Sequence, residues 1–177
     1  MTKIKVRPAD KPTLCAAFSL VFLGMVIASF FFFEVLALNV TPSVPVGIWC
    51  ISNSKISRGD YVKIDVGNFA AFEQYRHYPF KTNARGTIPF LKQVGGIAGD
   101  LVETRNGQIY INNVLVKNSR VFEEDRSGRP LTPFPLPYVL QKNEVWLISD
   151  SPYGFDSRYL GFARLEACKK AIPLLVS

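Results

Sequence analysis

The segment LVETRNGQIYI, residues 101–111, is the stretch of this chain that most clearly indicates its fold. β-prone residues lie on both sides of Asn106-Gly107, a pair typical of the type I′ turns that join two antiparallel strands. Other short β-prone runs lie at residues 46–51, 61–64, 87–94, 114–116 and 145–148. We therefore predict that residues 38–177 form a mostly antiparallel β domain with one or two short helices.

Some segments of this domain depart from the simple β pattern. Residues 68–78 place aromatic side chains at helical spacing after Asn68, a residue type that often caps helices, so we expect one short helix there. Residues 125–137 contain four prolines and are expected to form a long loop. Pro89 indicates that its own strand is an edge strand. The run at 145–148 is expected to be the last core strand.

A long apolar run precedes the β domain. Residues 14–33 are 20 consecutive residues without a charge, and a helix of that length spans about 30 Å, the thickness of a bilayer's hydrocarbon core. Four basic residues come before it: Lys3, Lys5, Arg7 and Lys11. The positive-inside rule then predicts a cytoplasmic N-terminus. We divide the chain into a basic tail (1–13), a single transmembrane signal anchor (14–37) and an exported domain (38–177). A cleaved signal peptide and a buried core helix are the alternative interpretations.

Composition excludes several classes of protein. The chain has 177 residues, is 48% hydrophobic, and carries 21 Lys+Arg against 14 Asp+Glu, a formal net charge of +7. It is too apolar to be disordered, and its basic residues form no run typical of a nucleic-acid-binding arm. One histidine and no CxxC pair argue against a metal site, and we expect no cofactor. Cys50 and Cys168 of the exported domain either form a disulfide or are two separate thiols.

Lys92 is the candidate base. It is the one charge in TIPFLKQVGGIAG, residues 87–99, and burial among apolar neighbours would lower its pKa far enough for it to accept a proton. The alternative is a lysine that extends from an edge strand into water. His77 lies in an aromatic stretch without a nucleophile motif, which argues against a Ser/His/Asp triad.

Ser43 is the candidate nucleophile. Pro42 and Pro45 bracket it and stiffen its loop, although this stretch taken alone favours an ordinary loop serine. Further along the chain, Asp156 and Arg158 are two residues apart in a turn or strand and are able to form an ion pair.

Three sequence boxes, in this order after an apolar anchor, resemble those of the signal peptidase I family, membrane-bound serine proteases with a Ser/Lys dyad. The boxes are TPSVP (41–45), LKQVGGIAGD (91–100) and FDSRYLG (155–161). The resemblance covers nearly the whole chain. Within the family the chain looks like the TraF-type conjugative-transfer peptidases, because Gly47-Ile48-Trp49 follows the serine box and Ser151-Pro152-Tyr153 replaces the usual Asn-Arg.

The resemblance implies roles for particular residues. Ser43 would attack the scissile carbonyl, Lys92 would accept its proton, and Asp156 would hold the dyad in place with Arg158 as its partner. The Ser43 backbone N–H and the Thr41 hydroxyl would stabilise the oxyanion. Leader peptidases have a serine where this chain has Gly154, so another hydroxyl must orient Lys92, and Ser157 is our candidate. The expected substrate-binding residues are Val44, Pro45, Ile88, Pro89, Phe90 and Leu91.

The expected function is therefore processing, with or without cyclisation, of a conjugative pilin precursor. The resemblance implies a bacterial inner-membrane protein with a periplasmic catalytic domain, whose partners are a membrane-inserted precursor and the lipid bilayer, with no nucleic acid or metal. The alternatives are a general type I signal peptidase and a non-catalytic anchored β module of a secretion apparatus. Residues 69–80 and 174–176 either dip into the membrane interface or pack in the domain.

Overall fold

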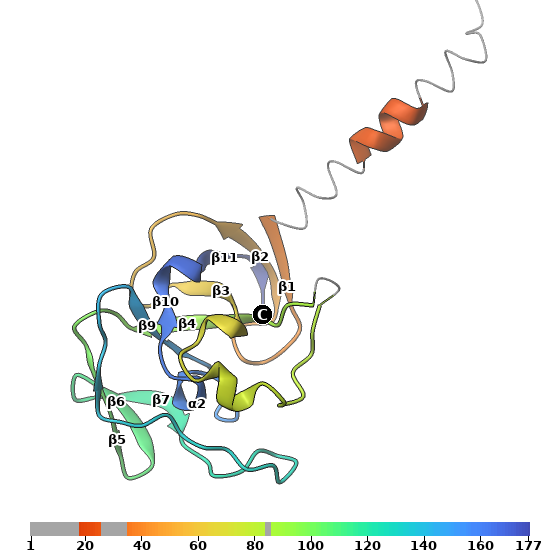
Figure 1. The fold of residues 1–177 in the computed structure, drawn as a ribbon. Coiled ribbons are helices and arrows are strands. Elements are labelled where there is room, and N and C mark those ends of the chain that lie inside the picture. The colour runs from red at the N-terminus through yellow and green to blue at the C-terminus, as the bar shows by residue number, and fades with distance from the viewer. Residues whose placement is uncertain (1–17, 26–34, 84–85) are drawn as a thin grey trace, which may run out of the picture. The chain divides into compact units, whose positions relative to one another are not determined.

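The computed structural model of this chain describes residues 18–25, 35–83 and 86–177 (Figure 1). The chain divides into two units, residues 1–36 and 37–177, and residues 18–25 of the first unit are helical. Residues 14–17 and 26–34 of the expected anchor lie outside the described ranges. Within those ranges, no helix is both long and apolar enough to cross a bilayer. The anchor therefore stays a prediction.

The second unit contains two β-sheets, as the alternating sequence pattern predicts. The larger sheet has the strand order β1-β2-β11-β3-β4-β9-β10 and the smaller one β7-β6-β5-β8. The strands of the larger sheet are β1 (Leu36–Asn39), β2 (Gly47–Ser52), β3 (Tyr61–Asp65), β4 (Pro89–Gly96), β9 (Glu144–Ile148), β10 (Ala163–Arg164) and β11 (Lys169–Val176). Those of the smaller sheet are β5 (Leu101–Arg105), β6 (Gln108–Ile111), β7 (Val114–Arg120) and β8 (Tyr138–Val139). In the larger sheet, every neighbouring pair from β2 to β10 in the strand order given above is antiparallel. All neighbouring pairs of the smaller sheet are antiparallel as well.

The predicted hairpin of β5 and β6 is confirmed. Asn106 and Gly107 have φ angles of 51° and 71°, and a type I′ turn requires positive φ at both central residues. The apolar residues Val102 and Ile109 face inward and pack against Trp146 of β9. The hairpin thus joins the small sheet to the large one through a shared core.

The prediction that residues 145–148 are the last core strand is wrong. β11 follows β9 in the chain and lies between β2 and β3, which are consecutive in sequence but not paired with each other. Its sequence, KKAIPLLV, lacks alternation and contains Pro173, so the sequence pattern predicts no strand there. The structure accommodates Pro173 at a register shift against β2. Residues 174–176 are thus part of a strand, although the Leu174 and Leu175 side chains remain exposed.

Residues 68–78 do not form the expected helix capped by Asn68. Two short 3-10 turns, η1 (Val66–Asn68) and η2 (Phe72–Tyr75), replace it, and Asp65 caps the first. Between them Phe69 is extended and bridges to Ala163, because this conformation buries its ring in the core. The expectation that residues 69–80 include core packing is confirmed, since aromatic side chains along the whole segment pack into the main cluster.

The prediction that this strand, β4, is an edge strand holds for only part of it, because β4 lies between β3 and β9 in the sheet. β9, however, pairs only with the half of β4 from Gln93 to Gly96. The half at Pro89–Leu91 pairs with β3 on one side and has no partner strand on the other among the described residues. This partial edge places a free stretch of backbone just before Lys92.

Cys50 and Cys168 are both free thiols, so the alternative of a disulfide is wrong. Burial raises the pKa of the Cys168 thiol to about 12. A thiol with so high a pKa is a poor nucleophile, and its place is structural.

Candidate active site

A buried asparagine shapes the loop that carries Ser43. The amide nitrogen of Asn39, at the end of β1, donates to the carbonyls of Thr41 (2.7 Å), Val44 (2.9 Å) and Pro45 (3.0 Å). Its oxygen accepts hydrogen bonds from the N–H and the hydroxyl of Thr41. One side chain thus bonds to the backbone on both sides of Ser43, which is itself half-exposed.

The hydroxyls of Thr41 and Ser43 lie 3.0 Å apart. Thr41 gives its single hydroxyl hydrogen to the Asn39 oxygen, which is only an acceptor. Ser43 is therefore the donor in its contact with Thr41. The Ser43 backbone N–H donates to no group in the part of the chain that the structure describes, so it is available to an oxyanion.

Lys92 is buried, with only 4% of its surface exposed, on the half of β4 next to the free backbone edge. Its Nζ lies 5.0 Å from the centroid of the Phe90 ring and forms no hydrogen bond with the described residues. Burial lowers the pKa of Lys92 to about 8, Asp156 and Asp150 oppose this shift, and Arg158 adds to it. The prediction of a buried lysine with a low pKa is confirmed, and the alternative of a lysine extending into water is wrong.

Ser43 and Lys92 line the same cavity, which has a volume of about 560 Å³. Residues of strand β1 and of the segment from residue 88 to 92 both line it. Ser43 also lines a second cavity of about 340 Å³, together with Tyr153 and the loop at 122–131. Tyr78, Gly154 and Phe155 line both cavities. Ser43, the candidate nucleophile, therefore lines both cavities.

The structure separates the expected substrate-binding residues into two groups. All four residues from β4 and its approach line the first cavity: Ile88, Pro89, Phe90 and Leu91. Val44 and Pro45 line neither cavity, which corrects the prediction. The Val44 side chain packs instead in a core cluster with Trp49, because the loop turns it inward.

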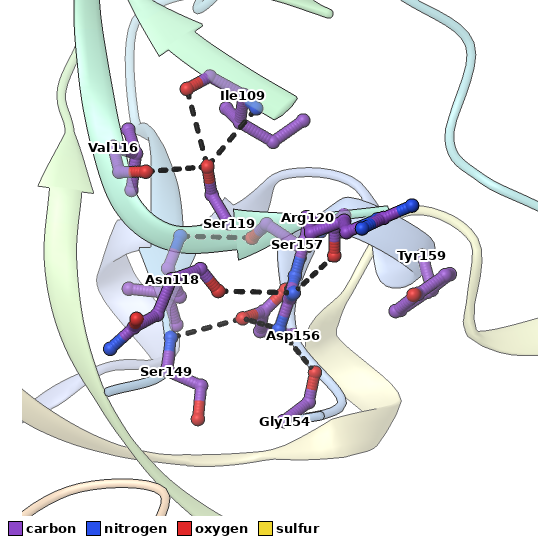
Figure 2. A network of polar contacts seen from close by, with 12 residues as sticks. Ile109, Val116, Asn118, Ser119, Arg120, Ser149, Gly154, Asp156, Ser157 and Tyr159 are labelled. Carbon is purple, nitrogen blue, oxygen red and sulfur yellow. Dashed lines mark hydrogen bonds and ion pairs between the residues drawn. The ribbon is translucent and has the colours of Figure 1, made fainter. Parts of the chain in front are cut away.

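Asp156 and Arg158 form a buried ion pair at the start of the single-turn helix α2 (Ser157–Leu160). The Arg158 Nε and Asp156 Oδ1 are 2.8 Å apart, and the two side chains are 3% and 2% exposed. Arg158 also donates to the carbonyls of Gly154 (2.6 Å), Arg120 (2.7 Å) and Pro152 (2.8 Å). Figure 2 shows the groups gathered around Asp156. With its hydrogen bonds satisfied, this pair fixes the turn that closes the site.

Ser157 is fully buried, and its hydroxyl accepts a hydrogen bond from the Leu147 N–H at 2.8 Å. It lines neither of the cavities beside Ser43. Its contact joins α2 to β9, so the geometry gives no support to its expected role in orienting Lys92.

Sequence reasoning missed residues that act on the Ser43 loop. Asp150 N–H and Ser149 Oγ both donate to the Ser43 carbonyl, at 2.8 and 3.1 Å. No sequence signal could have joined positions 106 residues apart. Asn39 carried a weak signal, since an asparagine directly before a proline-rich loop often bonds to nearby backbone.

Comparisons with known proteins show which family this chain resembles. The family model described as "Signal peptidase, peptidase S26" matches residues 11–169. The chain is 32% identical over 130 residues to the plasmid transfer protein TraF of Escherichia coli, which covers 70% of this chain and 72% of that protein. It is 30% identical over 129 residues to the conjugal transfer protein TraF of Agrobacterium tumefaciens (strain 15955), with coverage of 70% and 72%. A crystal structure of a signal peptidase I from Enterococcus faecalis V583 aligns with a TM-score of 0.40 and 17% identity, covering 69% of this chain and 100% of that one.

Proposed function

Since this chain belongs to the TraF-like branch of the signal peptidase family, peptidase S26, we propose that it is a membrane-anchored serine endopeptidase with a Ser43/Lys92 dyad. Family membership supports the peptidase role. One observation carries the assignment of residues: a buried lysine with a pKa near 8 lines the same cavity as the hydroxyl of Ser43. A neutral amine next to a serine is the arrangement that a Ser/Lys protease needs.

The proposed reaction follows from these groups. The Ser43 hydroxyl turns from Thr41 toward the neutral Lys92 amine, which takes its proton as the oxygen attacks the scissile carbonyl. The free Ser43 N–H donates to the oxyanion. Lys92 then returns the proton to the leaving amine, and a water molecule activated by the same lysine hydrolyses the acyl-enzyme.

The shape of the site supports binding of an extended substrate. The unpaired backbone edge at Pro89–Leu91 is able to add a peptide as a further strand, with its side chains in the larger cavity. Beyond Ser43, the chain after the cut continues into the smaller cavity beside Tyr153. The scissile bond then lies over Ser43, between the two cavities.

The proposed substrate is a conjugative pilin precursor, because the relatives described above are named as plasmid or conjugal transfer proteins. The proposal covers cleavage of the precursor with or without joining of the product's ends into a ring. A general type I signal peptidase is the second candidate, supported by the family match. It differs in that it would cut many exported precursors.

The proposed location is the inner membrane, with residues 38–177 in the periplasm. The apolar run at 14–33 and the four basic residues before it support this orientation. Protease added to spheroplasts should digest the exported domain while leaving a cytoplasmic control intact. Protection of the domain until the membrane is broken would contradict the orientation.

The test is to incubate the purified full chain with a pilin precursor in lipid vesicles and to measure intact masses. Ser43→Ala and Lys92→Ala should each abolish processing, whereas Lys142→Ala, which removes an exposed lysine, should leave it unchanged. Normal turnover by Lys92→Ala would refute the dyad, and a wild-type chain that processes no precursor would favour the non-catalytic module. A further loss of one water from the product would indicate ring closure. Cleavage of unrelated exported precursors would favour the general peptidase.

A further inference from the structure

Ser149 and Gly154 are complementary in size. A Cβ atom at Gly154 would collide with both Cβ and Oγ of Ser149, so the serine side chain occupies the space that any side chain at 154 would need. Gly154 lines both cavities beside Ser43, and Ser149 is 3% exposed behind it. A buried hydroxyl therefore lies directly behind the wall of the site, at a place where glycine leaves room for it.

The hydrogen bonds of Ser149 connect the two halves of the site. Its backbone N–H donates to Asp156 Oδ2 at 3.0 Å, and its hydroxyl donates to the Ser43 carbonyl at 3.1 Å. The hydroxyl also accepts a bond from the Ser151 N–H at 3.3 Å. Figure 2 shows Ser149 beside Asp156 and Gly154 in this network. Ser149 is thus the residue through which the buried Asp156 turn contacts the nucleophile's own peptide unit.

We propose that Ser149 is a positioning residue that holds the Ser43 peptide in its reactive orientation, and that Gly154 is required to make room for its hydroxyl. The role acts through Ser43 and involves no contact with the reacting atoms. Loss of the hydroxyl leaves the Ser43 carbonyl with Asp150 N–H as its remaining donor and lets the peptide unit rotate. Rotation of this Ser43–Val44 peptide unit shifts the Ser43 Cα, and with it the Ser43 Oγ and the N–H of the preceding peptide unit, which donates to the oxyanion. The activity readouts of this inference rest on the proposed function.

The first test compares Ser149→Ala with Ser119→Ala in the full chain. Ser119 is a matched control, because it is a buried serine whose hydroxyl bonds only to the backbone of Ile109 and Val116 and makes no bond to Ser43, Ser149 or Asp156 (Figure 2). We expect Ser149→Ala to lower kcat about tenfold, the effect of one well-placed hydrogen bond, with KM within about twofold. The midpoint of the pH–rate profile should not move, because Lys92 keeps its surroundings. Ser119→Ala should leave kcat unchanged. A kcat of Ser149→Ala equal to that of Ser119→Ala overturns the proposal.

The second test moves the hydroxyl to the other position. Ser149→Gly combined with Gly154→Ser returns a hydroxyl to the same space from the opposite side, whereas Ser149→Gly with Gly154→Ala fills the space without the oxygen. The first double variant should be at least about fivefold more active than the second, and both should melt at a higher temperature than Gly154→Ser alone. If Ser149→Ala fails to fold, the comparison of the two double variants still tests the proposal, since they differ by one oxygen atom. Equal activity of the two double variants overturns the proposal.

A third readout does not depend on catalysis. Hydrogen exchange at the Asp150 amide, which also bonds to the Ser43 carbonyl, should be at least about tenfold faster in Ser149→Ala and unchanged in Ser119→Ala. Unchanged exchange in Ser149→Ala overturns the positioning role. If the wild-type chain cleaved no precursor while exchange responded as expected, the proposed function would fail and the positioning role of Ser149 would stand.

Discussion

Lys92 links the stability of the fold to the protonation of one amine. The native state keeps this side chain buried, so its proton is lost near pH 8, whereas an unfolded chain would hold the proton up to the ordinary pKa of 10.5. The burial that makes the amine a usable base therefore destabilises the fold whenever the amine is charged. Two predictions follow from this one residue.

The first concerns the pH dependence of activity. In the proposed reaction, processing of the precursor requires a neutral Lys92, so kcat should rise with pH through a midpoint near 8. A pH–rate series on a single substrate measures this midpoint. An essential base that titrates near 10.5 would show that the working lysine is exposed, and the assignment of Lys92 would fail.

The second concerns stability. Between pH 8 and 10.5 the unfolded state binds more protons than the native state, so the contribution of Lys92 to the stability of the wild type rises with pH through that window. Lys92→Met should raise the free energy of unfolding at pH 7 by about 3 kcal/mol, and by only about 1 kcal/mol at pH 10. Urea unfolding at both pH values measures this, with Lys142→Met as the exposed control. An equal effect at both pH values would contradict a depressed pKa.

At the scale of elements, one short turn supports much of the site. The helix α2 is a single turn, too short to be stable by propensity, and Asp156 caps it while Arg158 donates to four backbone carbonyls of neighbouring segments. The same turn leads to Ser149, which contacts the Ser43 loop. The position of the Ser43 loop therefore depends on a buried ion pair that lines neither cavity.

Arg158→Met should destabilise the domain by about 3 to 5 kcal/mol, because it leaves Asp156 buried without its partner. Thermal or urea unfolding measures the loss. Arg164→Met is the control: its guanidinium is 71% exposed and lies 3.9 Å from Glu166, so its loss should change stability by less than about 0.5 kcal/mol. Equal effects of the two substitutions would mean that the buried pair is not what fixes the turn.

At the scale of the whole molecule, the larger sheet closes only when its last strand is in place. β11 bonds to β2 on one side and to β3 on the other, and it buries Ala171 beside Trp49 and Val44. Strands β2 and β3 have no pairing with each other that would replace it. β2 follows the Ser43 loop, and β3 pairs with β4, which carries Lys92. These strands are therefore held in one sheet only when β11 is in place.

A chain ending at Cys168 should not unfold cooperatively, because β2 and β3 would each lose a partner strand and the core beneath them would open. Leu175→Ser, at a side chain that is 72% exposed, should alter the free energy of unfolding by less than about 0.5 kcal/mol. Circular dichroism and urea unfolding distinguish the two. A cooperative transition in the shortened chain would show that β11 is dispensable.

Several features of the fold and of the candidate site were predictable from the sequence alone. The hairpin at 101–111 followed from residues close together in the chain, because turn preference is a local property. The local sequence also made a buried Lys92 and an Asp156–Arg158 ion pair candidates, but it left the alternative of a lysine extending into water open, and the structure decided between them. The insertion of β11, the 3-10 turns in place of a helix, and the bond from Ser149 to Ser43 did not follow. They result from contacts between distant segments, where the burial of the whole core outweighs local preference, and only folding brings those segments together.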